Sequence, residues 1–378
     1  MKRVLLIILF GLVALIPASV FAAATELTQA MFDSASNSTT PISLNGTNYT
    51  IVNGEYILGE NIDLGADHIQ FGAGNNVVID TNGKTITSSY SDGTIIINGA
   101  ATIEIKGAGS ILNTGSNKNS LVQRGGQGTT TIDGPTFNKV YVGEEPPVPI
   151  TTLIINSGTF EYLNCTGIDL TINDISIPAA ASSDNGIFLH DGTFVINDGT
   201  VASSNGLALD YYPDDINSSL IINGGTFNGH VAGLIFRTHS PNSPSLTIND
   251  GTFTGGQFGI YVVIDQPNLT INKGEFNGTS QAGIGFINTD MDVESILGER
   301  SKYESDPEFV VKNNMLVSKK NVEVIRETPE TPANDTTETT EEKKEETKNP
   351  KTGDFIHIYI SMLMLSSLGL LTIRKRLN

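Results

Sequence analysis

A short motif of alternating apolar and polar residues recurs along the middle of the chain. Its clearest copies are SLIINGGTF from Ser219, SLTINDGTF from Ser245 and NLTINKGEF from Asn268, with TLIINSGTF from Thr152 and TFVINDGT from Thr193. The copies share the consensus apolar-x-Ile-Asn-x-Gly-Thr-Phe. Strict alternation over so few residues indicates β-strands that bury one face.

The Asn of this motif, or the residue in its place, marks a period. The markers are Asp80, Lys106, Asp133, Asn156, Asn173, Asn197, Asn223, Asn249 and Asn272, and their spacings are 26, 27, 23, 17, 24, 26, 26 and 23 residues. A second series of short apolar segments begins at Gly186, Gly206, Gly233, Gly259 and Gly283. Each repeat therefore holds at least two strands, and units this small must stack to enclose a core.

Stacking places equivalent residues of successive repeats in columns. Apolar residues at marker positions −3 and −1 are expected to point inward, joined by phenylalanine at +4: Phe137, Phe160, Phe227, Phe253 and Phe276. The marker asparagines are expected to form an amide ladder. Glycine at +2 would supply the positive φ of a tight corner at Gly158, Gly199, Gly225, Gly251 and Gly274. We interpret both features as structural rather than catalytic.

From Gly54 to Asn288 these repeats resemble the right-handed β-helix superfamily that includes pectate lyases and polygalacturonases. The predicted fold class is all-β: a right-handed parallel β-helix of about nine coils over residues 54–290. Residues 25–53 are predicted to form an N-terminal cap, and residues 291–325 a C-terminal cap. Such caps are needed because both ends of a solenoid expose strand edges.

Each cap has a predicted element. A short amphipathic helix is expected over Thr25–Ser36, where Leu27, Ala30, Met31 and Ala35 are its apolar residues. A β-hairpin is expected over Phe309–Ile325, with Asn313 and Asn314 as its turn.

The N-terminus has the three regions of a secretory signal peptide. Lys2 and Arg3 precede an apolar stretch over 4–20, and small residues follow up to Ala24. We expect residues 1–24 to be removed by cleavage after Ala24 or Ala22. An uncleaved anchor helix is the alternative. With cleavage, the mature chain works outside the cytoplasm.

The C-terminus carries three further features in order. Asn349, Pro350, Lys351, Thr352 and Gly353 precede an apolar stretch over 355–373, and a basic tail, Arg-Lys-Arg, comes two residues before the end. Such a stretch is long enough to span a bilayer, and its basic tail favours the cytoplasmic side. The arrangement resembles the LPxTG sorting signal of Gram-positive surface proteins, with Asn349 in place of the usual Leu.

That resemblance implies a sortase transpeptidase and cell-wall peptidoglycan as partners. Cleavage would fall between Thr352 and Gly353, and Thr352 would be joined covalently to the wall. A plain membrane anchor is the alternative. Upstream, residues 326–348 read RETPETPANDTTETTEEKKEETK. Without large apolar residues this segment is expected to be a disordered acidic stalk.

Composition narrows the classes of function. The 378 residues include 39 glycines and no tryptophan, which favours a turn-rich β protein over a nucleotide-binding α/β enzyme. The formal net charge of −19 disfavours nucleic acid as a partner. The lone cysteine, Cys165, is interpreted as a small packed residue rather than a nucleophile.

Polar residues follow the second series of strands at positions +4 to +7 from each glycine, and they form the candidate ligand site. They are His190, Asp191, Asp210, Tyr211, Tyr212, Arg237, His239, Asp265, Asn288 and Asp290. Stacked along the rod, they suit a polysaccharide or a host glycan, with tyrosine rings for sugar faces and charged groups for hydroxyls or uronates.

Two other interpretations of this polar column stay open. Strand ends lead to solvent and are polar in any case. Alternatively, a divalent cation such as Ca²⁺ is held by some of Asp210, Asp214, Asp215 and Asp265, because hard cations prefer clustered carboxylate oxygens.

An enzyme is the alternative to a binding protein. Resemblance to the lyases implies an arginine base beside calcium-binding carboxylates, for which Arg237 with Asp210 and Asp265 is the candidate set. Resemblance to the polygalacturonases implies an ordered motif series, and Asn288-Thr289-Asp290 stands in the wrong order for it. We therefore assign no catalytic residue and predict a wall-anchored surface rod for adhesion or glycan binding.

Overall fold

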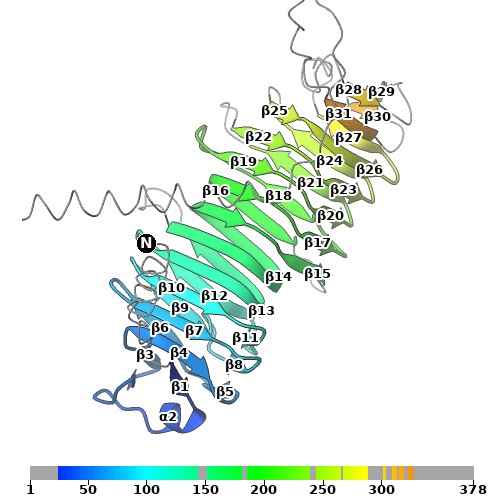
Figure 1. Cartoon of the computed structure of the whole chain (residues 1–378). Coiled ribbons are helices and arrows are strands. Elements are labelled where there is room, and N and C mark those ends of the chain that lie inside the picture. The colour runs from blue at the N-terminus through cyan, green and yellow to red at the C-terminus, as the bar shows by residue number, and fades with distance from the viewer. Residues whose placement is uncertain are drawn as a thin grey trace, which may run out of the picture. The chain divides into compact units, whose positions relative to one another are not determined.

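The computed structural model describes residues 24–143, 151–180, 185–238, 244–264 and 267–287, together with the backbone of four strands between 301 and 326 (Figure 1). All of these residues lie in the first of the two units into which the chain divides, Met1–Glu327. The predicted apolar stretch of the signal peptide, stalk residues 327–348, the sorting signal and the 355–373 stretch lie outside the described residues. Within the described part, no helix is both long enough and apolar enough to cross a membrane.

The repeats form a parallel β-helix of about nine turns, which confirms the predicted fold class. Each coil contributes a strand to three parallel stacks, and each strand pairs in parallel with its equivalent in the next coil. The marker residues end the strands of the first stack, which we call the ladder sheet. Its strands are β4 (Gly54–Leu58), β7 (Asn76–Asp80), β10 (Thr102–Lys106), parts of β13 (Thr129–Gly143), β14 (Thr151–Ile172) and β16 (Ile187–Ile196), β19 (Ser219–Ile222), β22 (Ser245–Ile248) and β25 (Asn268–Ile271).

The second stack, the phenylalanine sheet, carries the Thr-Phe half of the motif. Its strands are β5 (Ile62–Asp63), β8 (Thr85–Ser88), β11 (Ser110–Asn113), parts of β13 and β14, β15 (Ser176–Ala180), β17 (Thr200–Ser203), β20 (Thr226–Gly229), β23 (Thr252–Gly255) and β26 (Lys273–Gly278).

The third stack, the tyrosine sheet, holds the second series of segments. Its strands are β3 (Asn48–Ile51), β6 (His68–Gly72), β9 (Ile95–Asn98), β12 (Asn119–Arg124), parts of β13, β14 and β16, β18 (Leu209–Tyr211), β21 (Ala232–Arg237), β24 (Phe258–Val263) and β27 (Ala282–Phe286).

The predicted inward columns are confirmed. Position −1 is isoleucine in all nine repeats, and every one of these side chains is fully buried: Ile79, Ile105, Ile132, Ile155, Ile172, Ile196, Ile222, Ile248 and Ile271. The phenylalanine column stacks nearly parallel rings, with centroids 5.5 Å apart for Phe137–Phe160 and 4.9 Å for Phe227–Phe253. In the two coils between Phe160 and Phe227, the same inward position is occupied by Ile177 and Val201.

The asparagine ladder is confirmed as well. From Asn173 to Asn272, each marker Nδ2 donates to Oδ1 of the marker one coil earlier, in five bonds of 2.7–2.9 Å that end on Asn156. Glycine at +2 has positive φ throughout, from +105° at Gly225 to +153° at Gly158. A β-carbon is strained in that region, which explains the glycine column.

The N-terminal cap differs from its prediction. The helix, α2, spans only Gln29–Asp33, and Leu27 belongs to strand β1 (Thr25–Leu27), which pairs in parallel with β4. Phe32 is the fully buried residue of this helix, whereas Ala30 is exposed. The predicted helix was too long because residues 25–27 form backbone hydrogen bonds with the exposed edge of β4 instead. An isolated helix of this length is only marginally stable, so pairing with the sheet is favoured. β2 (Ile42–Asn45) and β3 complete this cap as an antiparallel pair.

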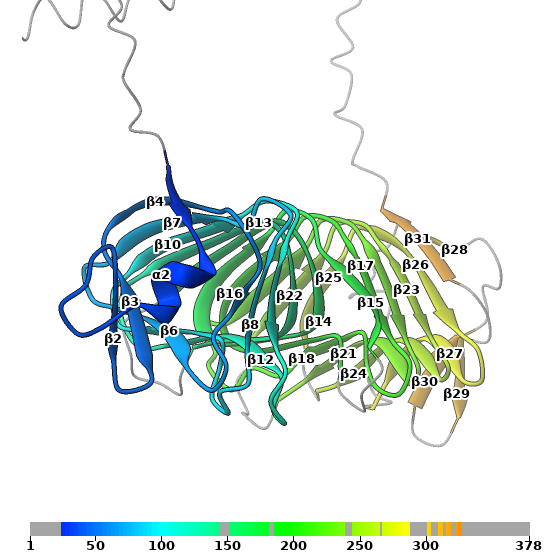
Figure 2. The same ribbon diagram turned by 90° about the horizontal axis from the view of Figure 1, so that it is seen from below.

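A C-terminal hairpin forms as predicted but is shorter than expected: β29 (Phe309–Lys312) and β30 (Met315–Ser318) pair antiparallel, whereas residues 322–326 form a separate strand. The predicted turn, Asn313 and Asn314, lies outside the described residues. β30 also pairs with β27, and β31 (Val322–Arg326) pairs with β26 and with β28 (Ser301–Tyr303), so added strands cover the last coil (Figure 2).

Candidate functional site

Aromatic side chains on the outside of the described strands gather on the tyrosine sheet. Pairing places Tyr141, Asn164, Phe188, Asp210, Ile235 and Tyr261 in one outward column of successive coils. A second outward column runs through Thr166, His190, Tyr212, Arg237 and Val263. The outward positions of the ladder sheet are instead mostly threonine, serine and aliphatic residues. One face of the rod is therefore chemically distinct.

The middle of this face forms a compact cluster, which we call the tyrosine patch: Phe188, His190, Asp210, Tyr212 and Arg237. The guanidinium carbon of Arg237 lies 4.5 Å from the ring centroid of Tyr212, in cation–π contact. The ring of His190 lies 5.5 Å from that of Tyr212, and the Phe188 ring lies 6.5 Å from it. Three neighbouring coils thus contribute to one surface.

A buried carboxylate holds the arginine in place. Arg237 donates from Nε to Oδ1 of Asp210 at 3.0 Å and from Nη2 to Oδ2 at 2.8 Å. Asn185 Nδ2 adds a third bond to Oδ2, at 3.0 Å. Asp210 is 1% exposed, whereas the Arg237 side chain is 41% exposed. The hydrogen bond to Asp210 raises the pKa of Arg237 although desolvation opposes it, so this arginine stays protonated.

His190 lies between two carboxylates. Its Nδ1 is 3.8 Å from Asp191 Oδ2, and its Nε2 is 3.6 Å from Asp214 Oδ2. Asp191 is itself buried, with φ of +47°, and its Oδ1 accepts the backbone N–H groups of Asp214 at 2.7 Å and Asp215 at 2.8 Å. Asp191 therefore anchors the loop after Tyr212.

No family model, curated protein or solved structure matches this chain. Of the predicted ligand residues, the structure brings together His190, Asp191, Asp210, Tyr212 and Arg237, with Asp214 from the candidate metal set. His239, Asp265 and Asp290 lie outside the described residues.

The prediction for Tyr211 is wrong. Its side chain is fully buried in the core, stacked on Phe236 with ring centroids 5.1 Å apart. The sequence alignment set Gly206 level with Gly186, but pairing sets Leu209 opposite Ile187, so Ala208 occupies the glycine position in this coil. The register is shifted by two residues, and Tyr211 falls on an inward position instead of beyond the strand.

The candidate cation ligands do not meet among the described residues. No group of three histidine, cysteine or acidic side chains there is placed to hold a metal ion. Asp210 is bound to Arg237, and Asp215 Oδ1 accepts the backbone and side-chain amides of Asn217, both at 3.0 Å. Each of these two carboxylates thus has a structural partner of its own.

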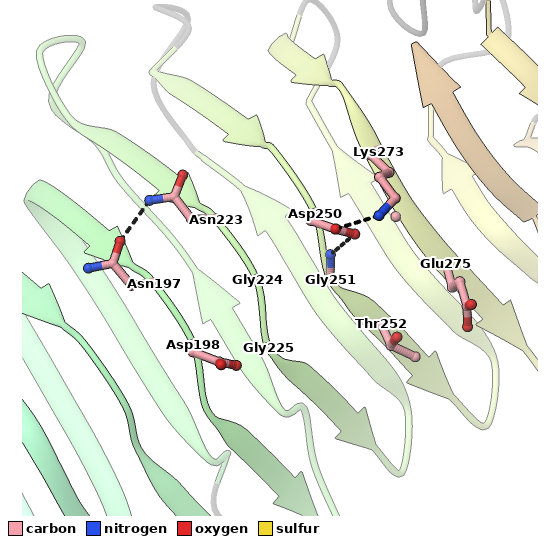
Figure 3. A pocket seen from close by; sticks show the side chains of 11 residues that line it. Asn197, Asp198, Asn223, Gly224, Gly225, Asp250, Gly251, Thr252, Lys273 and Glu275 are labelled. Carbon is pink, nitrogen blue, oxygen red and sulfur yellow. Dashed lines mark hydrogen bonds and ion pairs between the residues drawn. The ribbon is translucent and has the colours of Figure 1, made fainter. Parts of the chain in front are cut away.

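A groove that the sequence interpretation missed lies beside the asparagine ladder, at the corner between the ladder and phenylalanine sheets (Figure 3). Its volume is about 410 Å³, and Asp198, Asp250, Lys273 and Glu275 line it from three coils. Lys273 Nζ donates to Asp250 Oδ2 at 2.8 Å, and Asp198 and Asp250 each accept the N–H of the following glycine. Gly224 opens the space between the two aspartates (Figure 3).

Cys165 is buried in the core, and desolvation raises the pKa of its thiol. A thiol held protonated is a poor nucleophile. This agrees with the interpretation of Cys165 as a packed residue.

Proposed function

We propose that this protein is a bacterial surface rod that binds glycans through the tyrosine patch and is held on the cell wall through Thr352. The observation that carries the glycan proposal is the stack of Arg237 on Tyr212, in which Asp210 holds the guanidinium, on the sheet where the outward aromatic residues of the described strands gather. A guanidinium held in place can donate hydrogen bonds to the hydroxyl groups of a sugar, while the neighbouring aromatic rings pack against its C–H groups.

The directions of the donors support recognition of hydroxyls. Nε and Nη2 of Arg237 are used by Asp210, so Nη1 lies on the opposite edge of the guanidinium plane, and the side chain is 41% exposed. Because Asp210 fixes the guanidinium, little side-chain entropy is lost when a ligand binds.

Binding without turnover is the favoured form of this activity. An arginine that abstracts a proton must first lose its own, and the raised pKa of Arg237 opposes that loss. The alternative, a polysaccharide lyase, predicts unsaturated sugar products that absorb near 235 nm, which a binding protein does not form.

The test is binding of the purified full chain to a panel of polysaccharides, with absorbance followed in the same samples. Tyr212→Leu keeps the Arg237–Asp210 pair and should weaken binding about tenfold, because each aromatic contact contributes roughly 1 kcal/mol or more. Arg237→Ala should do the same.

The matched control is Arg124→Ala. Arg124 is the last residue of strand β12 in the same sheet, several coils away; it pairs with Asp92, and its side chain is 44% exposed. Equal loss of binding in this variant and in Arg237→Ala would contradict the assignment of the site. Product formation by the unmodified chain would favour the lyase.

A further inference from the structure

We propose that Asp191 is the positioning residue of the tyrosine patch: its buried carboxylate holds Tyr212 in the orientation that binds a glycan. This role rests on the proposed glycan binding, and it assigns the residue that keeps that same site in its binding form. Three features of the structure support it: the early end of strand β18, the hydrogen bonds of Asp191, and the backbone conformation of Asp191.

Tyr212 occupies a strand position without being part of a strand. β18 ends at Tyr211, whereas β21 and β24 continue in pairing through Arg237 and Val263, the residues at the same position in the next two coils. The backbone N–H of Tyr212 still donates to the carbonyl of Leu189 at 2.8 Å. A second restraint on this backbone must therefore come from the loop that follows.

The carboxylate of Asp191 supplies that second restraint. Its Oδ1 accepts the backbone N–H of Asp214 at 2.7 Å and that of Asp215 at 2.8 Å, and the Ser218 hydroxyl donates to it at 3.4 Å. Asp191 is 6% exposed and Ser218 is 2% exposed, so water competes little for these bonds. An ionised acceptor also forms stronger hydrogen bonds than a neutral one. The loop is thus anchored at its first residues and at its last.

Only Pro213 separates Tyr212 from this anchor. Pro213 is buried, and the proline ring fixes φ at about −65°, so the short connection has little freedom. The backbone of Tyr212 is therefore held on one side by its bond to Leu189 and on the other by Asp191. Held in this way, the Tyr212 ring centroid lies 4.5 Å from the guanidinium carbon of Arg237.

Asp191 adopts a backbone conformation that is unfavourable for aspartate. Its φ is +47°, and only Asn82 and Lys118 share a positive φ among the non-glycine residues in the described part of the chain. In the preceding coil the register sets Gly167, with φ of +66°, opposite Asp191. Glycine suits this corner without strain, but it cannot anchor the loop. Strained residues of this kind concentrate at functional sites.

The test measures binding of the full chain to four polysaccharides: homogalacturonan, hyaluronan, xylan and dextran. Asp191→Gly removes the carboxylate and suits the positive φ, as Gly167 does in the preceding coil, so the variant is expected to fold. It should bind about tenfold more weakly, as Tyr212→Leu does. Asp191→Asn keeps an oxygen acceptor and tolerates positive φ, so it should restore most of the affinity.

A double-mutant cycle separates positioning from a general loosening of the chain. Tyr212→Leu should weaken binding about tenfold in the unmodified chain, but no more than about twofold in the Asp191→Gly chain, where the ring is no longer held in place. Asn217→Ala is the matched control. It removes an exposed side-chain bond of 3.0 Å to Asp215 within the same loop and leaves the anchor intact, so the affinity should not change.

The adverse outcomes are distinguishable. Unchanged affinity in Asp191→Gly, or no recovery in Asp191→Asn, overturns the positioning role while the proposed function stands. The same follows if Tyr212→Leu costs tenfold in both backgrounds, or if Asn217→Ala binds as weakly as Asp191→Gly. Absence of binding of the unmodified chain to all four polysaccharides overturns the proposed function together with this role.

Discussion

A single buried histidine, His68, is expected to make the stability of this solenoid depend on pH. His68 in β6 is 3% exposed, stacks on Tyr90 with ring centroids 4.2 Å apart, and has no hydrogen-bond partner for Nδ1 among the described residues. Burial lowers the pKa of His68, although the nearby Gln70, Asp92 and Asp67 act in the opposite direction. The folded chain therefore holds this imidazole neutral.

This predicts a loss of stability in mild acid. Because the folded pKa lies below the ordinary value of about 6.5, the unfolded chain takes up the proton first as the pH falls. The stabilisation is complete above about pH 6.5 and decreases below it. His68→Phe keeps a ring against Tyr90 and should flatten the decline of Tm between about pH 7 and pH 5.

The control for this prediction is His230→Gln, which changes an exposed histidine. It should leave the pH dependence of Tm as it is in the unmodified chain. If Tm of His68→Phe falls with pH as steeply as Tm of the unmodified chain, other groups cause the acid sensitivity.

At the level of elements, the asparagine ladder links the ladder-sheet strands of six coils through side chains as well as backbone. Asn223 lies inside it: it donates to Asn197 and accepts from Asn249, both at 2.7 Å. Asn272 forms its last described rung and donates to Asn249. An interior member therefore contributes to two bonds and a terminal member to one.

Removing these side chains should have graded effects. Asn223→Ala should lower the free energy of unfolding by about 1–2 kcal/mol, and Asn272→Ala by about half as much, since each bond contributes roughly 1 kcal/mol or less. Urea unfolding measures both. Asn228→Ala, at an exposed position outside the ladder, is the control. Equal losses of unfolding free energy in the two ladder variants would contradict the assignment of two side-chain hydrogen bonds to Asn223 and one to Asn272.

The repeat made much of the fold predictable. A motif that recurs every 17 to 27 residues, with isoleucine always at −1, leaves few alternatives, and the columns and the ladder followed from it. The C-terminal hairpin was predicted separately, from the turn residues Asn313 and Asn314. Prediction failed where a coil departs from the repeat. Ala208 replaces the glycine that marks the strand, so β18 was misaligned and Tyr211 misplaced. In the N-terminal cap, β1 pairs with β4, a contact distant in sequence.

The candidate site was only partly predictable for a related reason. Their position just after the apolar segments of the second series selected His190, Tyr212 and Arg237, and stacking of the coils brings them together. The burial of Asp210 and the loop anchor at Asp191 depend on side-chain geometry that spacing does not encode. The corner groove had a signal in the variable residue after the marker, which is Asp198, Gly224, Asp250 and Lys273 in successive coils.

On the scale of the whole molecule, the two ends of the solenoid are covered. β1, α2 and the β2–β3 pair close the first coil, and β28 to β31 close the last (Figure 2). Covered ends prevent open strand edges from pairing with other copies of the chain. A capped rod is suited to display as a separate molecule.

The proposed wall attachment gives a prediction at this scale. Thr352→Ala should stop transfer of the chain to the cell wall, because it removes the side chain by which the proposed sortase would recognise the bond that it cleaves. The variant protein should then be extracted by detergent, whereas the unmodified protein should need digestion of the wall. A control substitution in the stalk, Thr340→Ala, should change nothing. Wall attachment of Thr352→Ala would contradict the proposed sorting signal.

The shared register of the coils also bears on how a chain of this kind can change in length. Asn223–Ile248 is one complete 26-residue unit whose columns continue on both sides. Duplicating such a unit preserves every contact with its neighbours and both caps, because each coil pairs only with the adjacent ones. The rod can therefore grow in steps of about 4.8 Å, and a copied unit is free to acquire new outward residues while its inward ones keep the core intact.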